Sequence, residues 1–258
     1  MICLRAEGGL CNRLRAINSA LCVARLTKHA LRVFWKTDPE MNCGFASLFE
    51  EPVGFKVKDV GREGLLMHAF FSTRNVFTRL QGDGAEVVAR VGKASPLRIW
   101  SRGAFLEFYR PEVPDYSWLR PLPSINKEVL RHFESFGPDA IGLHILRTDN
   151  DMAIKMSPLA LFIDKIEEHL SAQADQRFFV ATDDEPTKAA LRRRFGDHIY
   201  TREDIVRREA AGGVQDAVVD LFLLSKCRQI YGSYRSSFSD VAADIGCKPY
   251  KRLVVKEA

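Results

Sequence analysis

The chain has 258 residues, of which 46% are hydrophobic and 28% are charged, a composition typical of an ordinary soluble protein with a sizeable core. The net charge of +5 is too mild to indicate nucleic-acid binding. No apolar run approaches the roughly 18 residues that a membrane span needs, and no secretory signal precedes the first expected strand. We therefore expect a cytoplasmic protein without a transmembrane segment.

The six cysteines form no C-x-x-C pair, and no two histidines have the spacing of metal ligands. The sequence therefore predicts neither a disulfide framework nor a zinc site. We expect the cysteines to be small buried residues in a reducing compartment.

The N-terminal segment predicts a strand at residues 1–6, a glycine turn, a helix at 11–29 and a second strand at 30–35. This order is typical of a βα unit followed by a parallel neighbour. The pattern from residue 38 to 120 is less regular. Short strands are expected there at 54–60, 97–100 and 105–109.

A proline-rich linker at residues 110–124 precedes a half in which helices and strands alternate. The expected helices cover residues 125–136, 157–170, 185–195, 214–225 and 237–245. The expected strands cover residues 140–146, 177–182, 228–233 and 250–255. Such alternation predicts a parallel, doubly wound sheet, in which ligands bind beyond the carboxyl ends of the strands.

The glycine turn, EGGLCNRLR at residues 7–15, is one candidate anion site. Gly8 and Gly9 can adopt positive φ, and the free N–H groups at a helix start attract anions. Arg13 and Arg15 lie in the first helical turn, where each opposes the helix dipole by about 0.3–1 kcal/mol. A bound anion would remove that conflict. The alternative is a tight turn with two solvated arginines.

The end of the expected strand at 140–146 carries a second cluster, HILRTDND. His144 and Arg147 can donate to phosphate, while Asp149 can accept from a sugar hydroxyl. Asp149 and Asp151 also form a D-x-D pattern, with which one class of glycosyltransferase holds a metal bound to a nucleotide sugar. The alternative is a solvated loop after a core strand.

Three hydroxyls crowd the expected start of the last helix, at Ser236, Ser237 and Ser239. One serine is explained by capping, but three beside Arg235 favour an anion site.

Carboxylates occur in two further places. Asp183 and Asp184 end an expected strand, where they could cap a helix or bind ribose or base. Asp216 and Asp220 lie four residues apart on an otherwise apolar helix, where a carboxylate is costly unless it is paired.

Taken in order, these segments resemble the superfamily of GDP-fucose-dependent fucosyltransferases, which includes α-1,6-fucosyltransferases, the bacterial nodulation fucosyltransferase and the protein O-fucosyltransferases. The matching segments are EGGLCNRLR, IGLHILRTD, FFVATDD, DAVVDLFLLSKC and GSYRSSFSDVAADI. The resemblance implies an α/β fold of GT-B type, with two Rossmann-like domains facing a cleft. Residues 1–120 would form the acceptor domain and residues 121–258 the nucleotide-sugar domain. It also implies inverting transfer without a metal or other cofactor.

The residues and the resemblance together place one set of side chains at the donor: Asn12, Arg13, His144, Leu146, Asp149, Asp183, Asp184, Asp220, Arg235, Ser236, Ser237 and Phe238. In the resemblance, His144 and Arg147 lie at the diphosphate and Asp220 reads guanine. In the same resemblance, the phosphates are held by hydroxyl and backbone donors of Ser236, Ser237 and Phe238.

The reaction expected from the resemblance is transfer of fucose from GDP-fucose to a hydroxyl of a glycan or similar acceptor, with no nucleic acid involved. Glu7, or Asp151 as second choice, would deprotonate the acceptor. Arg147 would stabilise the departing diphosphate, with Arg13 or Arg15 as additional cations.

Two positions depart from the family pattern: Cys11 replaces a glycine of the N-terminal loop, and Leu146 stands where the family has an arginine that binds the diphosphate. An alternative is therefore a catalytically impaired relative that binds a nucleotide sugar without transferring it. Another alternative is a metal-dependent enzyme of GT-A type that uses Asp149 and Asp151.

Overall fold

A computed structural model describes residues 1–61, 69–71, 76–77, 96–105, 114–148, 151–202 and 211–255. The chain divides into two compact units. Unit 1 comprises Met1–Leu122 with Arg208–Gln215, and unit 2 comprises Pro123–Arg207 with Asp216–Ala258. Among the described residues, no helix is long and apolar enough to cross a membrane.

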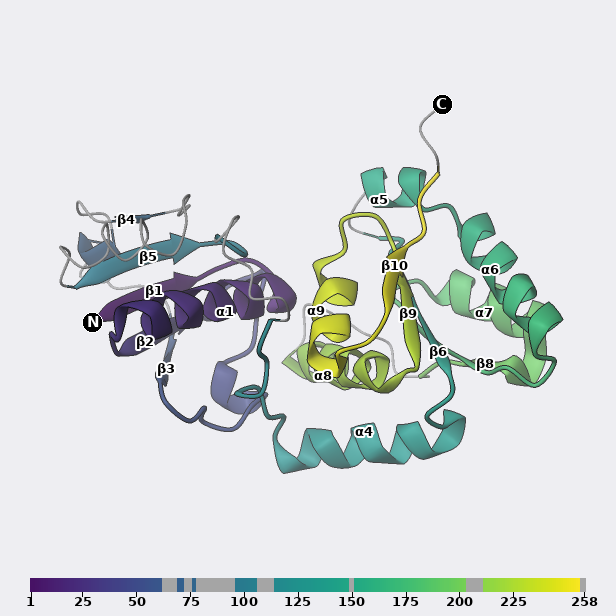
Figure 1. The fold of residues 1–258 in the computed structure, drawn as a ribbon, viewed down its shortest axis with the longest axis horizontal. Helices are drawn as coiled ribbons and strands as arrows, with labels where there is room; N and C mark the ends of the chain where they lie inside the picture. The colour runs from purple at the N-terminus through teal and green to yellow at the C-terminus, as the bar shows by residue number, and fades with distance from the viewer. Residues whose placement is uncertain are drawn as a thin grey trace. The chain divides into compact units, whose positions relative to one another are not determined.

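Unit 1 is built on a parallel sheet with the strand order β3-β2-β1-β5-β4 (Figure 1). The strands are β1 (Ile2–Ala6), β2 (Leu31–Lys36), β3 (Lys56–Val60), β4 (Val76–Phe77) and β5 (Leu97–Ser101). Every residue of the central strand β1 is buried, and Ile2 pairs with Leu31 on one side and Leu97 on the other. A short 3-10 helix, η1, covers Phe45–Ser47.

Helix α1 (Leu10–Thr27) packs against β1. The apolar residues that predicted it, among them Leu14 and Ile17, are fully buried. The helix ends at Thr27 and is capped by Lys28, which has a left-handed backbone (φ 54°) and whose N–H donates to the carbonyls of Ala24 and Arg25. Of the two glycines that could adopt positive φ in the preceding turn, Gly8 does (φ 86°) and Gly9 is extended (φ −68°).

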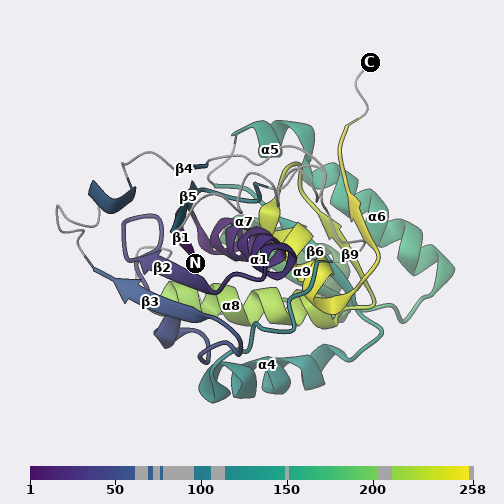
Figure 2. The same ribbon diagram turned by 60° about the vertical axis from the view of Figure 1, so that its left-hand side comes forward.

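Unit 2 holds a second parallel sheet, with the order β10-β9-β6-β7-β8. Its strands are β6 (Ile141–Ile145), β7 (Phe178–Thr182), β8 (Ile199–Tyr200), β9 (Gln229–Gly232) and β10 (Tyr250–Arg252). The helices are α4 (Pro123–Phe136), α5 (Asp151–Met156), α6 (Leu159–Ala172), α7 (Glu185–Phe195), η2 (Gly196–His198), α8 (Ala211–Lys226) and α9 (Ser237–Gly246). Of α8, only the part from Asp216 onward belongs to unit 2. Helices cover both faces, with α6 and α9 on opposite sides of β9 (Figures 1 and 2).

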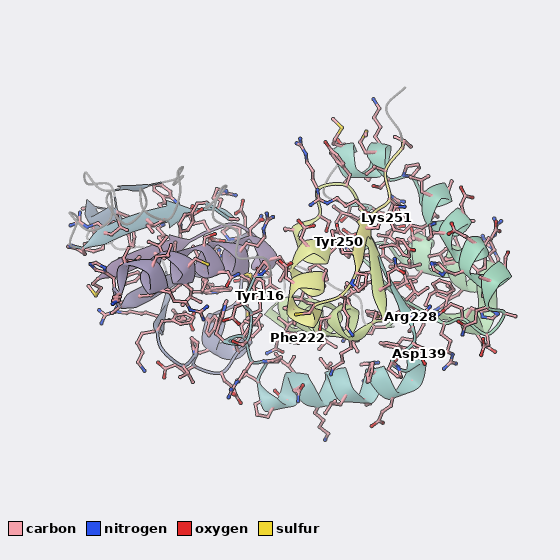
Figure 3. All side chains as sticks on the ribbon, viewed as in Figure 1. Tyr116, Asp139, Phe222, Arg228, Tyr250 and Lys251 are labelled. Carbon is pink, nitrogen blue, oxygen red and sulfur yellow. The ribbon has the colours of Figure 1, made fainter. Side chains whose placement is uncertain are left out.

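Side chains along β6 alternate between the two faces of the sheet in unit 2, and both faces are buried. Ile141, Leu143 and Ile145 join one buried apolar cluster with Phe162 and Ile166 of α6. His144 points to the opposite face, toward α9. The outer strand β10 is linked to α9 as well, since Arg252 donates to both carboxylate oxygens of Asp240 at 2.9 Å. Its first residue, Tyr250, lies beside α9 (Figure 3).

The expected α/β architecture with parallel sheets is confirmed. Strand β8 and helix α5 were not predicted, because segments of two and six residues are too short to show a period. Most of the strand expected at residues 105–109 lies outside the described residues. The expected cleft between two domains stays a prediction.

Candidate functional site

The carboxyl ends of the parallel strands in unit 2 bring four polar segments to one edge of the sheet. These are residues 146–148 after β6, 183–184 after β7, 201–202 after β8 and 233–237 after β9. Because the strands are parallel neighbours, segments far apart in sequence meet along this edge, where open α/β sheets bind their ligands.

His144 is held by α9 at this edge. Its Nδ1 lies 2.9 Å from the hydroxyl of Ser239 and 3.0 Å from that of Ser236. The ring stacks on Phe238, with centroids 4.8 Å apart and planes inclined by 25°. The close approach depends on Gly232, because a Cβ there would lie 2.2 Å from the Ser239 hydroxyl oxygen. The structure therefore gives the buried imidazole a fixed orientation.

The start of α9 brings together the serines that the sequence singled out. The Ser236 hydroxyl caps the helix by accepting from the N–H of Ser239 at 3.4 Å, and Ser237 is the first residue of the helix. Arg235 is exposed, has a left-handed backbone (φ 52°) and lies over the ring of Tyr234 at 5.1 Å. Helix N–H groups, hydroxyls and a cation next to one another form a suitable environment for an anion.

The loop after β6 is fixed from both neighbouring strands. The N–H of Leu146 donates to the hydroxyl of Ser233 at 3.0 Å, and the N–H of Arg147 donates to a carboxylate oxygen of Asp183 at 3.0 Å. The Thr148 hydroxyl donates to the second oxygen of Asp183. The half-buried Leu146 thus lies in a loop that hydrogen bonds hold on both sides. Asp183 has a structural role, because its carboxylate accepts two of these bonds. Sequence reasoning missed Ser233, which is not distinguished from other loop serines by any local pattern.

The guanidinium of Arg147 turns back onto the protein. It donates to the backbone carbonyls of Leu146 at 3.1 Å and Ser157 at 2.9 Å. Burial lowers the pKa of Arg147, while Asp184 and Asp183 act in the opposite direction. Since an arginine has five N–H donors and stays protonated, further donors remain for a ligand.

Asp184 caps helix α7. One of its carboxylate oxygens accepts from the N–H of Thr187 at 2.9 Å and from the Thr187 hydroxyl at 2.6 Å. The capping alternative that the sequence left open therefore holds for Asp184.

Asp216 and Asp220 are paired, as their positions on an apolar helix required. Both accept from Arg202, which follows β8: Nη2 lies 2.7 Å from an oxygen of Asp216, and Nη1 lies 3.2 Å from an oxygen of Asp220. Burial raises the pKa of Asp220 to about 6, with Arg202 opposing the rise. Sequence reasoning missed Arg202, because the two-residue strand before it gave no signal.

Glu7 in unit 1 follows β1 and forms a buried ion pair. One of its carboxylate oxygens accepts from Nε and Nη2 of Arg5 at 2.8 and 2.5 Å. Burial acts to raise the pKa of Glu7, but hydrogen bonds from Trp100 and Arg5 outweigh it, so the net pKa is lowered. A carboxylate with a lowered pKa is a weaker proton acceptor than a general base at neutral pH should be.

Arg13 is buried, which corrects the alternative of a solvated arginine, and its place at the donor stays a prediction. The side chain is fully buried and donates to the carbonyl of Gly8 at 2.6 Å, to that of Lys36 and to Asp38 at 2.9 Å. These hydrogen bonds connect the glycine turn to the end of β2. Arg15 is half-buried, as is Asn12, which lies directly beside Gly8.

The D-x-D pair is described in part only. Asp149 lies outside the described residues, and Asp151 is the exposed first residue of α5. Within the part of the chain that the structure describes, no group of three or more His, Cys, Asp or Glu side chains could hold a metal ion.

Solved structures of fucosyltransferases are similar to this chain. Fucosyltransferase NodZ from Bradyrhizobium is 15% identical, with a TM-score of 0.61 over 93% of this chain and 92% of that one. A mutant of Arabidopsis thaliana FUT1 in complex with GDP is 16% identical, with a TM-score of 0.68 over 99% and 71%. POFUT1 in complex with GDP-fucose is 12% identical, with a TM-score of 0.60 over 98% of each chain. No protein-family model and no curated protein matches the sequence. The likeness confirms the expected fold.

Proposed function

We propose that the chain is an inverting glycosyltransferase that transfers fucose from GDP-fucose to a hydroxyl of a glycan acceptor. The observation that carries this proposal is the cluster of His144, Ser236 and Ser239 at the start of α9, on the sheet edge where such folds bind nucleotides. The likeness in fold to proteins solved with GDP or GDP-fucose supports the choice of donor. In this proposal residues 121–258 bind the donor and residues 1–120 the acceptor.

The proposed role of the α9 cluster is to hold the diphosphate. The helix start, the Ser237 hydroxyl and the backbone of Phe238 supply donors to phosphate oxygens, while His144 is oriented by its two serines. Arg147 and Arg235 supply positive charge at the same edge. Donors preorganised where negative charge develops are worth several kcal/mol to a transition state.

The reaction that fits this arrangement is a single displacement. The acceptor oxygen attacks C1 of fucose from the face opposite the diphosphate, and the C1–O bond breaks with its electron pair going to the β-phosphate oxygen. The acceptor proton passes to a carboxylate. Glu7 remains the first candidate and Asp151 the second. The ion pair between Glu7 and Arg5 favours testing both.

The experiment that tests the proposal is a calorimetric titration with a panel of GDP- and UDP-sugars, followed by assays of GDP release with glycan acceptors. We expect binding of GDP-fucose in preference to UDP-sugars, and GDP release that depends on the acceptor. Equal affinity for both nucleotides would contradict the proposed donor. Release unaffected by EDTA would exclude the metal-dependent alternative.

A second candidate is a relative that binds the nucleotide sugar without transferring it. Two observations favour it: Leu146 replaces the family arginine, and the neighbouring Arg147 guanidinium donates to the carbonyls of Leu146 and Ser157. Binding of GDP-fucose without GDP release in the presence of any glycan would support this candidate.

A further inference from the structure

Arg202 is a buried cation shared between two carboxylates of unequal depth. Its side chain is 5% exposed, that of Asp216 is 28% exposed and that of Asp220 is 12% exposed. Nη2 donates to Asp216 at 2.7 Å, and Nη1 donates to the Asp216 carbonyl at 2.9 Å and to Asp220 at 3.2 Å. The side chain of the shallower carboxylate therefore has the shorter hydrogen bond to Arg202, and that of the deeper one has the longer bond.

The cations around Asp220 do not fully offset the cost of burying its negative charge. Arg202 faces it from the end of β8, Lys188 from α7 and Asp216 from its own helix. Lys188 is itself engaged, because its Nζ lies 3.2 Å from a carboxylate oxygen of Glu185 and donates to the Arg202 carbonyl at 3.2 Å. Burial outweighs the two cations and raises the pKa of Asp220 to about 6, close to neutral pH.

We propose that Arg202 is a positioning residue for base recognition: by dividing its guanidinium between Asp216 and Asp220, it orients Asp220 and sets the fraction of that side chain that is ionised and able to read guanine. This inference rests on the proposed function, because it takes Asp220 as the residue that contacts the base. Asp216 then acts as a competitor that weakens the hold of Arg202 on Asp220.

The chemistry of guanine explains why ionisation of Asp220 matters. Guanine presents the N1–H and the N2 amino group as donors, and only an ionised carboxylate accepts from both. One oxygen of Asp220 accepts from Arg202, while the other has no hydrogen bond within the described part of the chain. Hypoxanthine lacks the amino group, and a site built to bond a group rejects the analogue without it. Preference for GDP over IDP therefore reports the ionised state of Asp220.

The test is calorimetric titration of the full chain with GDP and with IDP, from about pH 5 to about pH 9. In the unchanged protein we expect GDP affinity to fall as the pH drops through about 6, where the Asp220 carboxylate takes up a proton. In Arg202→Gln we expect the midpoint of that fall to rise by about one pH unit or more, because an opposite charge is lost. In this variant, GDP affinity near pH 7 should drop several-fold and recover at alkaline pH. The ratio of the affinities for GDP and IDP should drop and recover in the same way.

Two further variants keep this outcome distinct from damage to the fold. Asp216→Asn removes the competing carboxylate, so the midpoint should move to lower pH, opposite to Arg202→Gln. Arg192→Gln is the matched control, because Arg192 donates to the carbonyl of the neighbouring Thr201 at 2.9 Å and not to Asp220. Its midpoint should equal that of the unchanged protein.

The outcomes separate this inference from the proposed function. An unchanged protein that binds neither GDP nor IDP overturns both. GDP binding with one midpoint in all variants, or an affinity loss in Arg202→Gln that is the same at every pH, overturns the role of Arg202 alone. Opposite movements of the midpoint in Arg202→Gln and Asp216→Asn support it.

Discussion

The imidazole of His144 and the hydroxyl of Ser236 lie 3.0 Å apart although 92 residues separate them in the sequence. The first belongs to β6 and the second caps α9, so this contact joins the carboxyl end of a central strand to the start of a helix. It brings the imidazole Nδ1 of His144, the capping hydroxyl of Ser236 and the N-terminal end of α9 close together. The predictions below concern this region and the groups that surround it.

Ser236→Ala should destabilise unit 2 and weaken GDP binding together. The variant loses the cap of α9 and the bond to His144, which we expect to lower the free energy of unfolding by about 1–2 kcal/mol. Urea denaturation measures the loss, and calorimetry measures GDP binding. Ser237→Ala, which keeps both contacts, should have nearly unchanged stability. Equal stability losses in the two variants would contradict the capping role.

Leu146→Arg should raise the turnover of GDP-fucose about tenfold or more, because an added donor stabilises charge that develops on the departing diphosphate. GDP release with an acceptor present measures the effect. Leu146→Met is the control, since it changes shape little and adds no donor. If the unchanged protein already transfers fucose rapidly, the impaired alternative is wrong.

Exchange of the correct base for its amide should lower kcat by about 10²–10⁴-fold while GDP affinity is retained. Glu7→Gln and Asp151→Asn, assayed side by side, identify which carboxylate has that role. A loss confined to Asp151→Asn would assign the base to the exposed start of α5 and leave Glu7 as the partner of Arg5. Small losses in both variants would exclude both carboxylates.

Asp220 should make the unfolding free energy depend on pH in a specific direction. Its pKa is raised from 3.8 to about 6, so the folded protein binds the proton more tightly than the unfolded chain. Stability from this group is therefore complete below about pH 4 and is lost as the pH rises to about 6, by on the order of 2–3 kcal/mol.

Denaturation of the unchanged protein and of Asp220→Asn at several pH values measures this contribution as a difference. The stability of the unchanged protein relative to the variant should decline between about pH 4 and about pH 6 and then stay constant. A difference that grows with pH would show that Arg202 dominates over burial.

Arg13→Met should be among the more destabilising changes in unit 1. It leaves Asp38 without its cation and the carbonyls of Gly8 and Lys36 without their donor, which we expect to cost about 3–5 kcal/mol. Arg32→Met is the control, because Arg32 is exposed on β2 of the same unit. Equal unfolding free energies for the two variants would contradict the structural role of Arg13.

The sequence predicted the parallel sheets and the polar edge because hydrophobic periodicity and the alternation of strands and helices along the chain are local signals. It also required a partner for Asp220 without naming one. Arg202 could not be found, since it follows a strand of two residues and its role depends on a helix that comes later in the chain. Arg13 shows another difficulty: an arginine in a first helical turn indicates solvent or a bound anion, and no local pattern indicates that Asp38 of the same unit is its partner.

The absence of a side chain at Gly232 has a consequence for ligand binding. Gly232 is the register partner of His144, and it lies so close to Ser239 that any side chain there would push α9 off the sheet. The strand and the helix are therefore in direct contact, and this contact orients the imidazole. If the proposed function is correct, the entropy that a flexible site loses on binding a nucleotide is lost here when the protein folds.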